Sequence, residues 1–180
     1  METDNFKTVL YLLIIIAINQ LGTASYCQAD TLHADEFSSC FGGTTVKNNT
    51  QGDIGVIMER TQSGEDAGCE FHPKGGNIPL DNKHSRIELK PERSINDGYY
   101  VVTITFKNED GKWAETDWIK DNGQRSTEVH ILPDVRKLAN DNKIKGMTEY
   151  FIKIRVQPWK FEGLEKPAFV FSQLLILPVK

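Results

Sequence analysis

Residues 96–119 read NDGYYVVTITFKNEDGKWAETDWI, and this stretch decides the fold. Apolar side chains recur at every second position after the turn at residues 96–98, which is the pattern of a half-buried β-strand. A second turn follows at residues 108–111, and we expect KWAETDWI to return from it as an antiparallel partner. The stretch therefore predicts a β-hairpin. Its expected core side chains are Tyr100, Val102, Ile104 and Phe106.

Other segments carry strand or helix patterns of their own. Alternation with period two recurs at residues 54–59, 86–90 and 149–156, which predicts three more half-buried strands. Residues 169–177, FVFSQLLIL, are almost continuously apolar, which is typical of a strand buried on both faces. The helical stretch is PDVRKLAN at residues 133–140, where proline suits the first helical position.

Together these patterns predict an all-β fold, namely an antiparallel β-sandwich of jelly-roll type with one short crossover helix. Residues 30–53 are small and polar, which indicates loops and at most one edge strand. An immunoglobulin-like sandwich is the alternative. It fits less well because Cys40 and Cys69 bracket the N-terminal third with no tryptophan between them.

The N-terminus predicts export. Residues 8–18, TVLYLLIIIAI, form an apolar run that is shorter than the roughly 20 residues a membrane-spanning helix needs. A short apolar run followed by small residues is typical of a cleaved secretory signal, with a signal anchor as the alternative. We expect residues 1–29 to be a signal peptide and residues 30–180 to be a single secreted β-sandwich domain. The expected location is secreted or periplasmic, without membrane contact after cleavage.

The cysteines depend on where the signal is cleaved. Cleavage after Ala29 leaves Cys40 and Cys69, an even pair that predicts a disulfide in an oxidising compartment. Cleavage after Ser25 would leave Cys27 as an odd thiol, and Cys27 is also a candidate for lipid attachment. Cys69-x-x-His72 has one of the short spacings of a zinc site but lacks the second, so we expect no metal ligands and no cofactor.

The net charge and one short motif bear on which classes of partner we expect. The net charge is −4, whereas nucleic acids and anionic membranes favour a basic surface, so we expect no nucleic-acid partner. Asn48-Asn49-Thr50 is a glycosylation acceptor triplet if the host is eukaryotic. The triplet is short enough to occur by chance, so by itself it assigns no role.

Three tryptophans are candidate binding residues because sugars stack on flat aromatic faces flanked by polar groups. Trp113, Trp118 and Trp159 lie at or near the ends of expected strands. Trp113 and Trp118 are an odd number of residues apart, so on a regular strand they face opposite sides, and at least one should lie in the core. We expect at least one of the three to be exposed on a concave surface as the sugar platform.

A second candidate surface is charged. Arg86, Glu88 and Lys90 alternate with apolar residues on one expected strand, and Lys153, Arg155 and Gln157 do so on another. If these two strands share a sheet, their polar side chains line one face. Such a face would form a cationic groove for an acidic sugar or polymer.

Residues 85–178 resemble the galactose-binding-like jelly rolls found among carbohydrate-binding modules. The likeness lies in the order of four segments, KWAETDWI, ILPDVRKLA, EYFIKIRV and FVFSQLLIL. This resemblance implies a non-catalytic domain whose partner is a carbohydrate or a cell-surface glycan. A third class of function is an extracellular protein-interaction module without a sugar site.

Three segments also resemble jelly-roll polysaccharide lyases of the alginate-lyase type. SRIEL contains Arg86, TEVHI contains His130 and YFIKIRVQ contains Tyr150, although Glu128 stands where that family carries glutamine. The resemblance implies β-elimination on a uronate polymer, in which Arg86 neutralises the carboxylate while His130 and Tyr150 move protons. This enzyme alternative needs an exposed Tyr150, whereas alternation puts Tyr150 in the core with Ile152.

Overall fold

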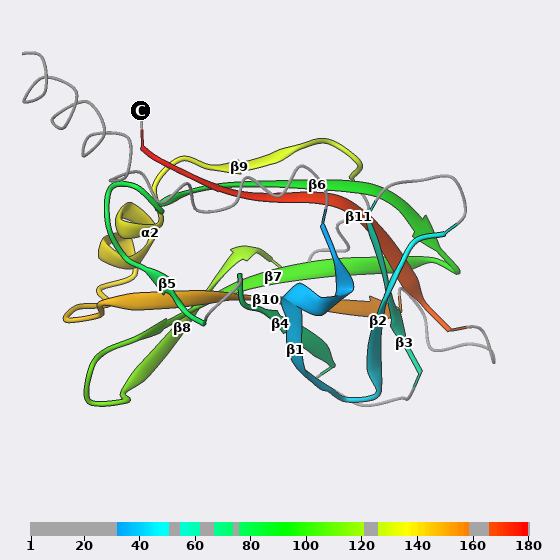
Figure 1. Ribbon diagram of the computed structural model, residues 1–180, viewed down its shortest axis with the longest axis horizontal. Helices are drawn as coiled ribbons and strands as arrows, with labels where there is room; N and C mark the ends of the chain where they lie inside the picture. Colours follow the sequence, from blue (N-terminus) through cyan, green and yellow to red (C-terminus); the bar gives the residue numbers. More distant parts are fainter. Residues whose placement is uncertain are drawn as a thin grey trace, which may run out of the picture.

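The computed structural model describes residues 32–50, 55–61, 67–73, 76–120, 126–158 and 166–179. In these residues the chain forms two antiparallel sheets packed face to face, with one α-helix (Figure 1). The elements in chain order are η1 (Ala34–Glu36), β1 (Phe37–Phe41), β2 (Thr44–Asn48), β3 (Val56–Arg60), β4 (Gly68–Phe71), β5 (Ile78–Pro79), β6 (Arg86–Ile95), β7 (Gly98–Lys107), β8 (Trp113–Ile119), β9 (His130–Leu132), α2 (Val135–Asp141), β10 (Glu149–Pro158) and β11 (Ala168–Leu177). The predicted all-β sandwich with one short helix is confirmed.

The strands are divided between the two sheets in a jelly-roll arrangement. The six-stranded sheet has the order β1-β4-β10-β7-β8, with β5 also paired to β10, and the five-stranded sheet has the order β2-β3-β11-β6-β9. From β6 onward the chain crosses the sandwich repeatedly. Strands β6, β9 and β11 lie in the five-stranded sheet, and β7, β8 and β10 lie in the six-stranded sheet. The central pairs β10–β7 and β11–β6 are built from ten-residue strands.

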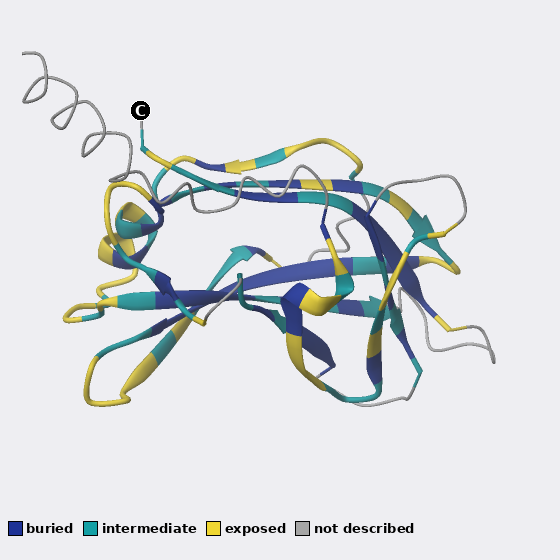
Figure 2. Cartoon of the chain, in the orientation of Figure 1, coloured by how far each residue is buried: buried dark blue, intermediate teal, exposed yellow. Residues whose placement is uncertain are grey.

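The core lies between the inner faces of the sheets. Tyr100, Val102, Ile104 and Phe106 of β7 are each 0 % exposed, as are Ile152 and Ile154 of β10. The predicted inward face is therefore confirmed, since these side chains belong to the hydrophobic core cluster, whereas Val101, Thr103 and Thr105, which alternate with them on β7, do not. Figure 2 shows the buried residues running along β7, β10 and β11.

The turn at Asn96 and Asp97 carries the chain from β6 to β7, which lie in different sheets. Both residues have positive φ, 50° and 55°, and such a turn favours asparagine, aspartate and glycine. Gly98 follows where the backbone of β11 approaches closely. A Cβ atom at this position would lie 2.5 Å from the carbonyl oxygen of Ala168.

The helix begins two residues later than the proline pattern predicts. Asp134 is the N-cap, and its side chain accepts a hydrogen bond from the backbone nitrogen of Arg136. Because this carboxylate satisfies a free amide of the first turn, α2 begins at Val135 and Pro133 lies before the cap. The helix buries Val135 and Ala139 at one end of the sandwich (Figure 1).

Two further expectations need correction. Residues 34–48 contain η1, β1 and β2 rather than loops with one edge strand, because pairing with β4 and β3 orders a segment whose own pattern is weak. Strand β11 is not buried throughout: residues 168–171 and the neighbours Leu174 and Leu175 are buried, whereas the middle and the last residues of the strand are half-buried. Phe169, Val170 and Phe171 are buried, whereas Ser172 and Gln173 are half-buried.

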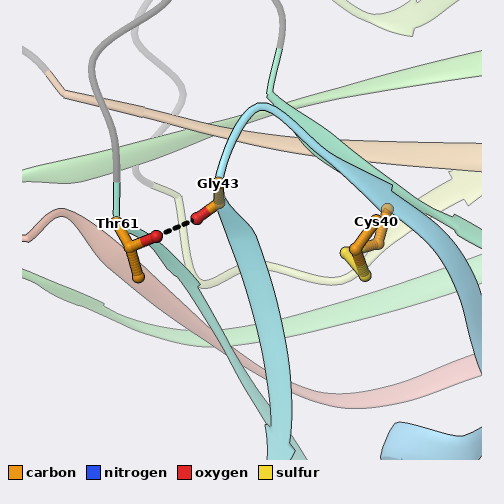
Figure 3. Close-up of a disulfide and its surroundings, with 4 residues drawn as sticks. Cys40, Gly43 and Thr61 are labelled. Atoms are coloured by element: carbon orange, nitrogen blue, oxygen red, sulfur yellow. Dashed lines mark hydrogen bonds between the residues drawn. A yellow bond between two sulfur atoms is a disulfide. The ribbon is translucent and has the colours of Figure 1, made fainter.

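A disulfide joins Cys40 of β1 to Cys69 of β4, which confirms the predicted pairing. Their Cα atoms are 4.1 Å apart, and Cys69 is fully buried. The turn after β1 is held as well, since the Thr61 hydroxyl donates to the Gly43 carbonyl at 2.5 Å (Figure 3). The N-terminal strands are thus fixed to the sandwich covalently and by hydrogen bonds.

Candidate binding site

The strand register gathers chemically varied side chains on the solvent side of the six-stranded sheet. On β7 and β10 the inward residues belong to the core cluster, so the alternate residues, and the β8 residues paired with them, point away from the core. Lys107 lies opposite Trp113 and Glu149, and Thr105 lies opposite Glu115 and Phe151. We call this surface the outer face. It consists of Thr103, Thr105, Lys107, Trp113, Glu115, Asp117, Glu149, Phe151, Lys153 and Arg155.

The charges of the outer face are paired across β7. Lys153 Nζ lies 2.6 Å from Glu115 Oε1, and Arg155 Nη2 lies 3.4 Å from Asp117 Oδ1. The hydroxyls of two β7 threonines donate to the same carboxylate oxygens, at 2.9 and 3.0 Å. Lys153 and Arg155 are therefore already neutralised by carboxylates of the protein, and this part of the face offers ordered donors and acceptors without a cationic groove.

Phe151 occupies the middle of the outer face but is covered. It is 4 % exposed, because the His72 ring stacks on it with centroids 5.0 Å apart and an interplanar angle of 23°. Lys107 Nζ lies 5.1 Å from the centre of the same ring. His72 Nε2 is in turn 3.2 Å from Glu70 Oε2. Phe151 thus anchors its neighbours and presents little aromatic surface to a ligand.

Trp113 is the exposed aromatic of the outer face. The large hydrophobic side chains exposed in the described part of the chain are Trp113 at 66 %, Ile131 at 51 % and Val129 at 48 %. Trp118 is half-buried against the core, next to a register shift between the pairs Val102–Ile119 and Thr103–Asp117. Trp159 lies outside the described residues. Of the three candidate tryptophans, Trp113 therefore has the exposure that a stacking platform needs.

The expected groove containing Arg86, Glu88 and Arg155 is wrong. Arg86 and Glu88 lie on β6 in the five-stranded sheet, where they form an ion pair with each other, and Arg155 lies on β10 in the six-stranded sheet. The two sheets pack through their inner faces, so their outer faces point away from each other. Trp113 and Arg155 do share the outer face, but they are about six residues apart along the strands, roughly 20 Å.

The residues of the lyase alternative do not converge. Tyr150 is 0 % exposed, its hydroxyl donates to the His84 carbonyl, and burial raises its pKa. His130 Nε2 lies 2.5 Å from the hydroxyl of the buried Tyr100, and burial lowers the pKa of His130. Arg86 lies on β6 in the five-stranded sheet, whereas Tyr150 lies on β10 in the six-stranded sheet. A buried Tyr150 cannot protonate a leaving group, so the catalytic roles expected for these residues are wrong. Tyr150 and His130 instead hold the structure through their hydrogen bonds to His84 and Tyr100.

Sequence reasoning missed the environment of Trp113. Lys107 is directly opposite it, and Phe151 lies under the Lys107 ammonium group. The alternation of residues 151, 153 and 155 predicts that they share one face of β10, but it does not predict which strands pair with β10. His72 comes from beyond the end of β4, almost eighty residues earlier, so local periodicity carries no signal for its stacking on Phe151.

Within the described ranges, no three His, Cys, Asp or Glu side chains gather as a metal site would require. No helix in that part of the chain has the length and apolar character needed to cross a membrane.

Fold and site together define a disulfide-bonded antiparallel β-sandwich with an aromatic and charged outer face. No family model matches the chain, and no curated protein matches it. Among solved structures it is similar to a chain in the crystal structure of accessory secretory protein 1, 2 and 3 in Streptococcus pneumoniae. The identity is 12 %, the match covers 84 % of this chain and 98 % of that chain, and the TM-score is 0.46. A likeness this loose transfers no function.

Proposed function

We propose that this chain is an exported, non-catalytic carbohydrate-binding domain whose platform is Trp113 on the outer face. The observation that carries the proposal is the 66 % exposure of Trp113 on a strand whose other side packs against the core. A tryptophan side chain offers a large apolar surface, and leaving most of it in water forgoes the hydrophobic free energy of burial. A sugar ring stacked on the indole recovers part of that free energy.

The surroundings of Trp113 suit a neutral sugar. Lys107 lies directly opposite, and Glu115 follows two residues later on the same side of β8. These groups supply a donor and an acceptor for sugar hydroxyls. Lys153 and Arg155 already face Glu115 and Asp117, so an acidic polymer would have to displace existing ion pairs. We therefore favour a neutral glycan over a uronate polymer.

The disulfide supports the location in this proposal. Disulfides persist in oxidising compartments and are rare in the cytosol. The pair Cys40–Cys69 thus agrees with a secreted or periplasmic protein. The signal peptide at residues 1–29 lies outside the described residues and remains a prediction from the sequence.

A glycan array tests the proposal. We expect the wild-type chain to bind a subset of neutral glycans and Trp113→Ala to lose this binding at an unchanged melting temperature. The matched control is Ile131→Ala, which truncates a comparably exposed apolar side chain on the other sheet and should bind like wild type. Equal binding by wild type and Trp113→Ala would remove the platform from the proposal.

A protein-interaction module is the second candidate, and a different surface favours it. Strand β9 is the last strand at one side of the five-stranded sheet, and Val129 and Ile131 are about half exposed there. Edge strands can accept an extended segment of a partner through backbone hydrogen bonds. In this case Ile131→Ala would weaken partner binding and Trp113→Ala would not, which is the reverse of the glycan result.

A further inference from the structure

The triplet Asn48-Asn49-Thr50 lies where the five-stranded sheet meets solvent. Asn48 is the last residue of β2, which is the strand at the opposite side of that sheet from β9. Asn48 and Thr50 are both exposed. The sequence contains one Asn-x-Ser/Thr triplet, and the fold puts Asn48 and Thr50 on the surface, as an acceptor requires.

From this geometry we infer that Asn48 is the acceptor of an N-linked glycan when the protein is exported by a eukaryotic cell. The Asn48 side chain is oriented by one contact, since its Oδ1 atom accepts a hydrogen bond from the backbone nitrogen of Ala34 at 2.8 Å. Within the described part of the chain, no group bonds to Nδ2. The carbonyl end of the amide is held, and the residue whose side-chain nitrogen would carry the glycan is exposed.

The modification is compatible with the contact that holds Asn48. The donor is an oligosaccharide linked to a lipid pyrophosphate. The Asn48 Nδ2 atom forms a bond to the anomeric carbon, the bond between that carbon and the pyrophosphate oxygen breaks, and one amide proton is lost to a base. The lipid pyrophosphate leaves with the bonding electrons. The product keeps its carbonyl oxygen and one N–H, so the hydrogen bond from Ala34 persists in the glycosylated protein.

The backbone around the triplet is also in place for an attached chain. The Asn49 amide donates to the Gly55 carbonyl at 2.8 Å, which fixes the end of β2 beside the start of β3. Because β2 belongs to the five-stranded sheet and Trp113 to the six-stranded sheet, a glycan on Asn48 leaves the outer face uncovered. The inference therefore stands independently of the proposed carbohydrate-binding function.

The test uses the full chain secreted from eukaryotic cells. We expect one discrete mass increase on wild type, removed by a peptide N-glycosidase that converts Asn48 to aspartate, as seen by peptide mapping. Thr50→Ser should keep the increase and Thr50→Ala should lose it. Thr50→Ala is a sharper test than Asn48→Gln, because it keeps the hydrogen bond from Ala34 to Asn48.

Two results would overturn the inference. One is an unmodified Asn48 peptide in folded, secreted wild-type protein, a reading that needs no variant to fold. The other is a mass increase that persists in Thr50→Ala, because the glycan would then be attached elsewhere. Enzymatic removal of the glycan should leave the melting temperature within about a degree of the glycosylated protein, since the Ala34 contact needs only the carbonyl oxygen.

Discussion

Trp113 and Lys107 lie directly opposite each other on β8 and β7, and the Lys107 ammonium group sits 5.1 Å from the ring of Phe151. The lysine side chain therefore reaches the buried phenyl ring on β10, whereas the exposed indole lies on β8, on the other side of β7. A cation over an aromatic face is stabilised by about 0.5–1 kcal/mol at an exposed site. This contact fixes the ammonium group on the outer face, across β7 from Trp113.

Removal of the disulfide should lower the free energy of unfolding and leave the fold itself unchanged. Replacing Cys40 and Cys69 together by serine opens a loop with a sequence separation of 29 residues. The chain-entropy relation gives a loss of roughly 3–4 kcal/mol for a loop of this size. Denaturant unfolding measures the difference. Free thiols on both cysteines in exported wild-type protein would contradict the assignment.

Truncation of Phe106 should be costly because the side chain is 0 % exposed. We predict that Phe106→Ala lowers the free energy of unfolding by about 3–5 kcal/mol, from lost burial and a residual cavity. Lys112→Ala, at an exposed position in the neighbouring turn, is the control and should change it by less than about 0.5 kcal/mol. Wild-type melting of Phe106→Ala would mean that the strand register is wrong.

Tyr150 should matter for stability and not for chemistry. Tyr150→Phe leaves the buried His84 carbonyl without its hydroxyl partner, and we predict a loss of about 1–3 kcal/mol. Wild-type protein should release no unsaturated product from uronate polymers, as followed by ultraviolet absorbance. Product that disappears in Tyr150→Phe would restore the lyase alternative.

His130 should make the fold sensitive to mild acid. Burial lowers its pKa below the ordinary value of 6.5, so between the two pKa values the unfolded chain binds more protons than the folded one. Stability is therefore unaffected above about pH 6.5 and falls as the pH drops below that value. The variant His130→Gln can still donate to Tyr100 and should have a flatter stability profile between pH 5 and 8. Parallel profiles for the two proteins would contradict a buried, neutral His130.

The sequence predicts the central hairpin well and the sheet partners poorly, for a physical reason. Alternation is a local property, so the inward faces of β7 and β10 can be read directly from residues 99–107 and 149–156. Assignment to sheets is a property of the whole chain. The pattern around Arg86 and the pattern around Arg155 look alike, yet their strands lie in opposite sheets.

Trp118 and the N-terminal strands illustrate the same limit. The odd spacing from Trp113 correctly suggests that the two indoles lie on different sides. The register shift beside Trp118 is a bulge, which depends on pairing with β7 and is not visible in β8 alone. Strand β1 has little alternation, and its position is fixed by pairing with β4 and by the bond between Cys40 and Cys69.

The most direct test of the central claim is calorimetric titration of one neutral glycan, selected on the array, into wild type, Trp113→Phe and Trp113→Ala. We predict saturable 1:1 binding to wild type, weaker binding to Trp113→Phe because a smaller flat ring remains, and no measurable heat with Trp113→Ala. All three proteins should melt alike, since the indole is 66 % exposed. Equal dissociation constants for wild type and Trp113→Ala would contradict the assignment of the outer face as the sugar site.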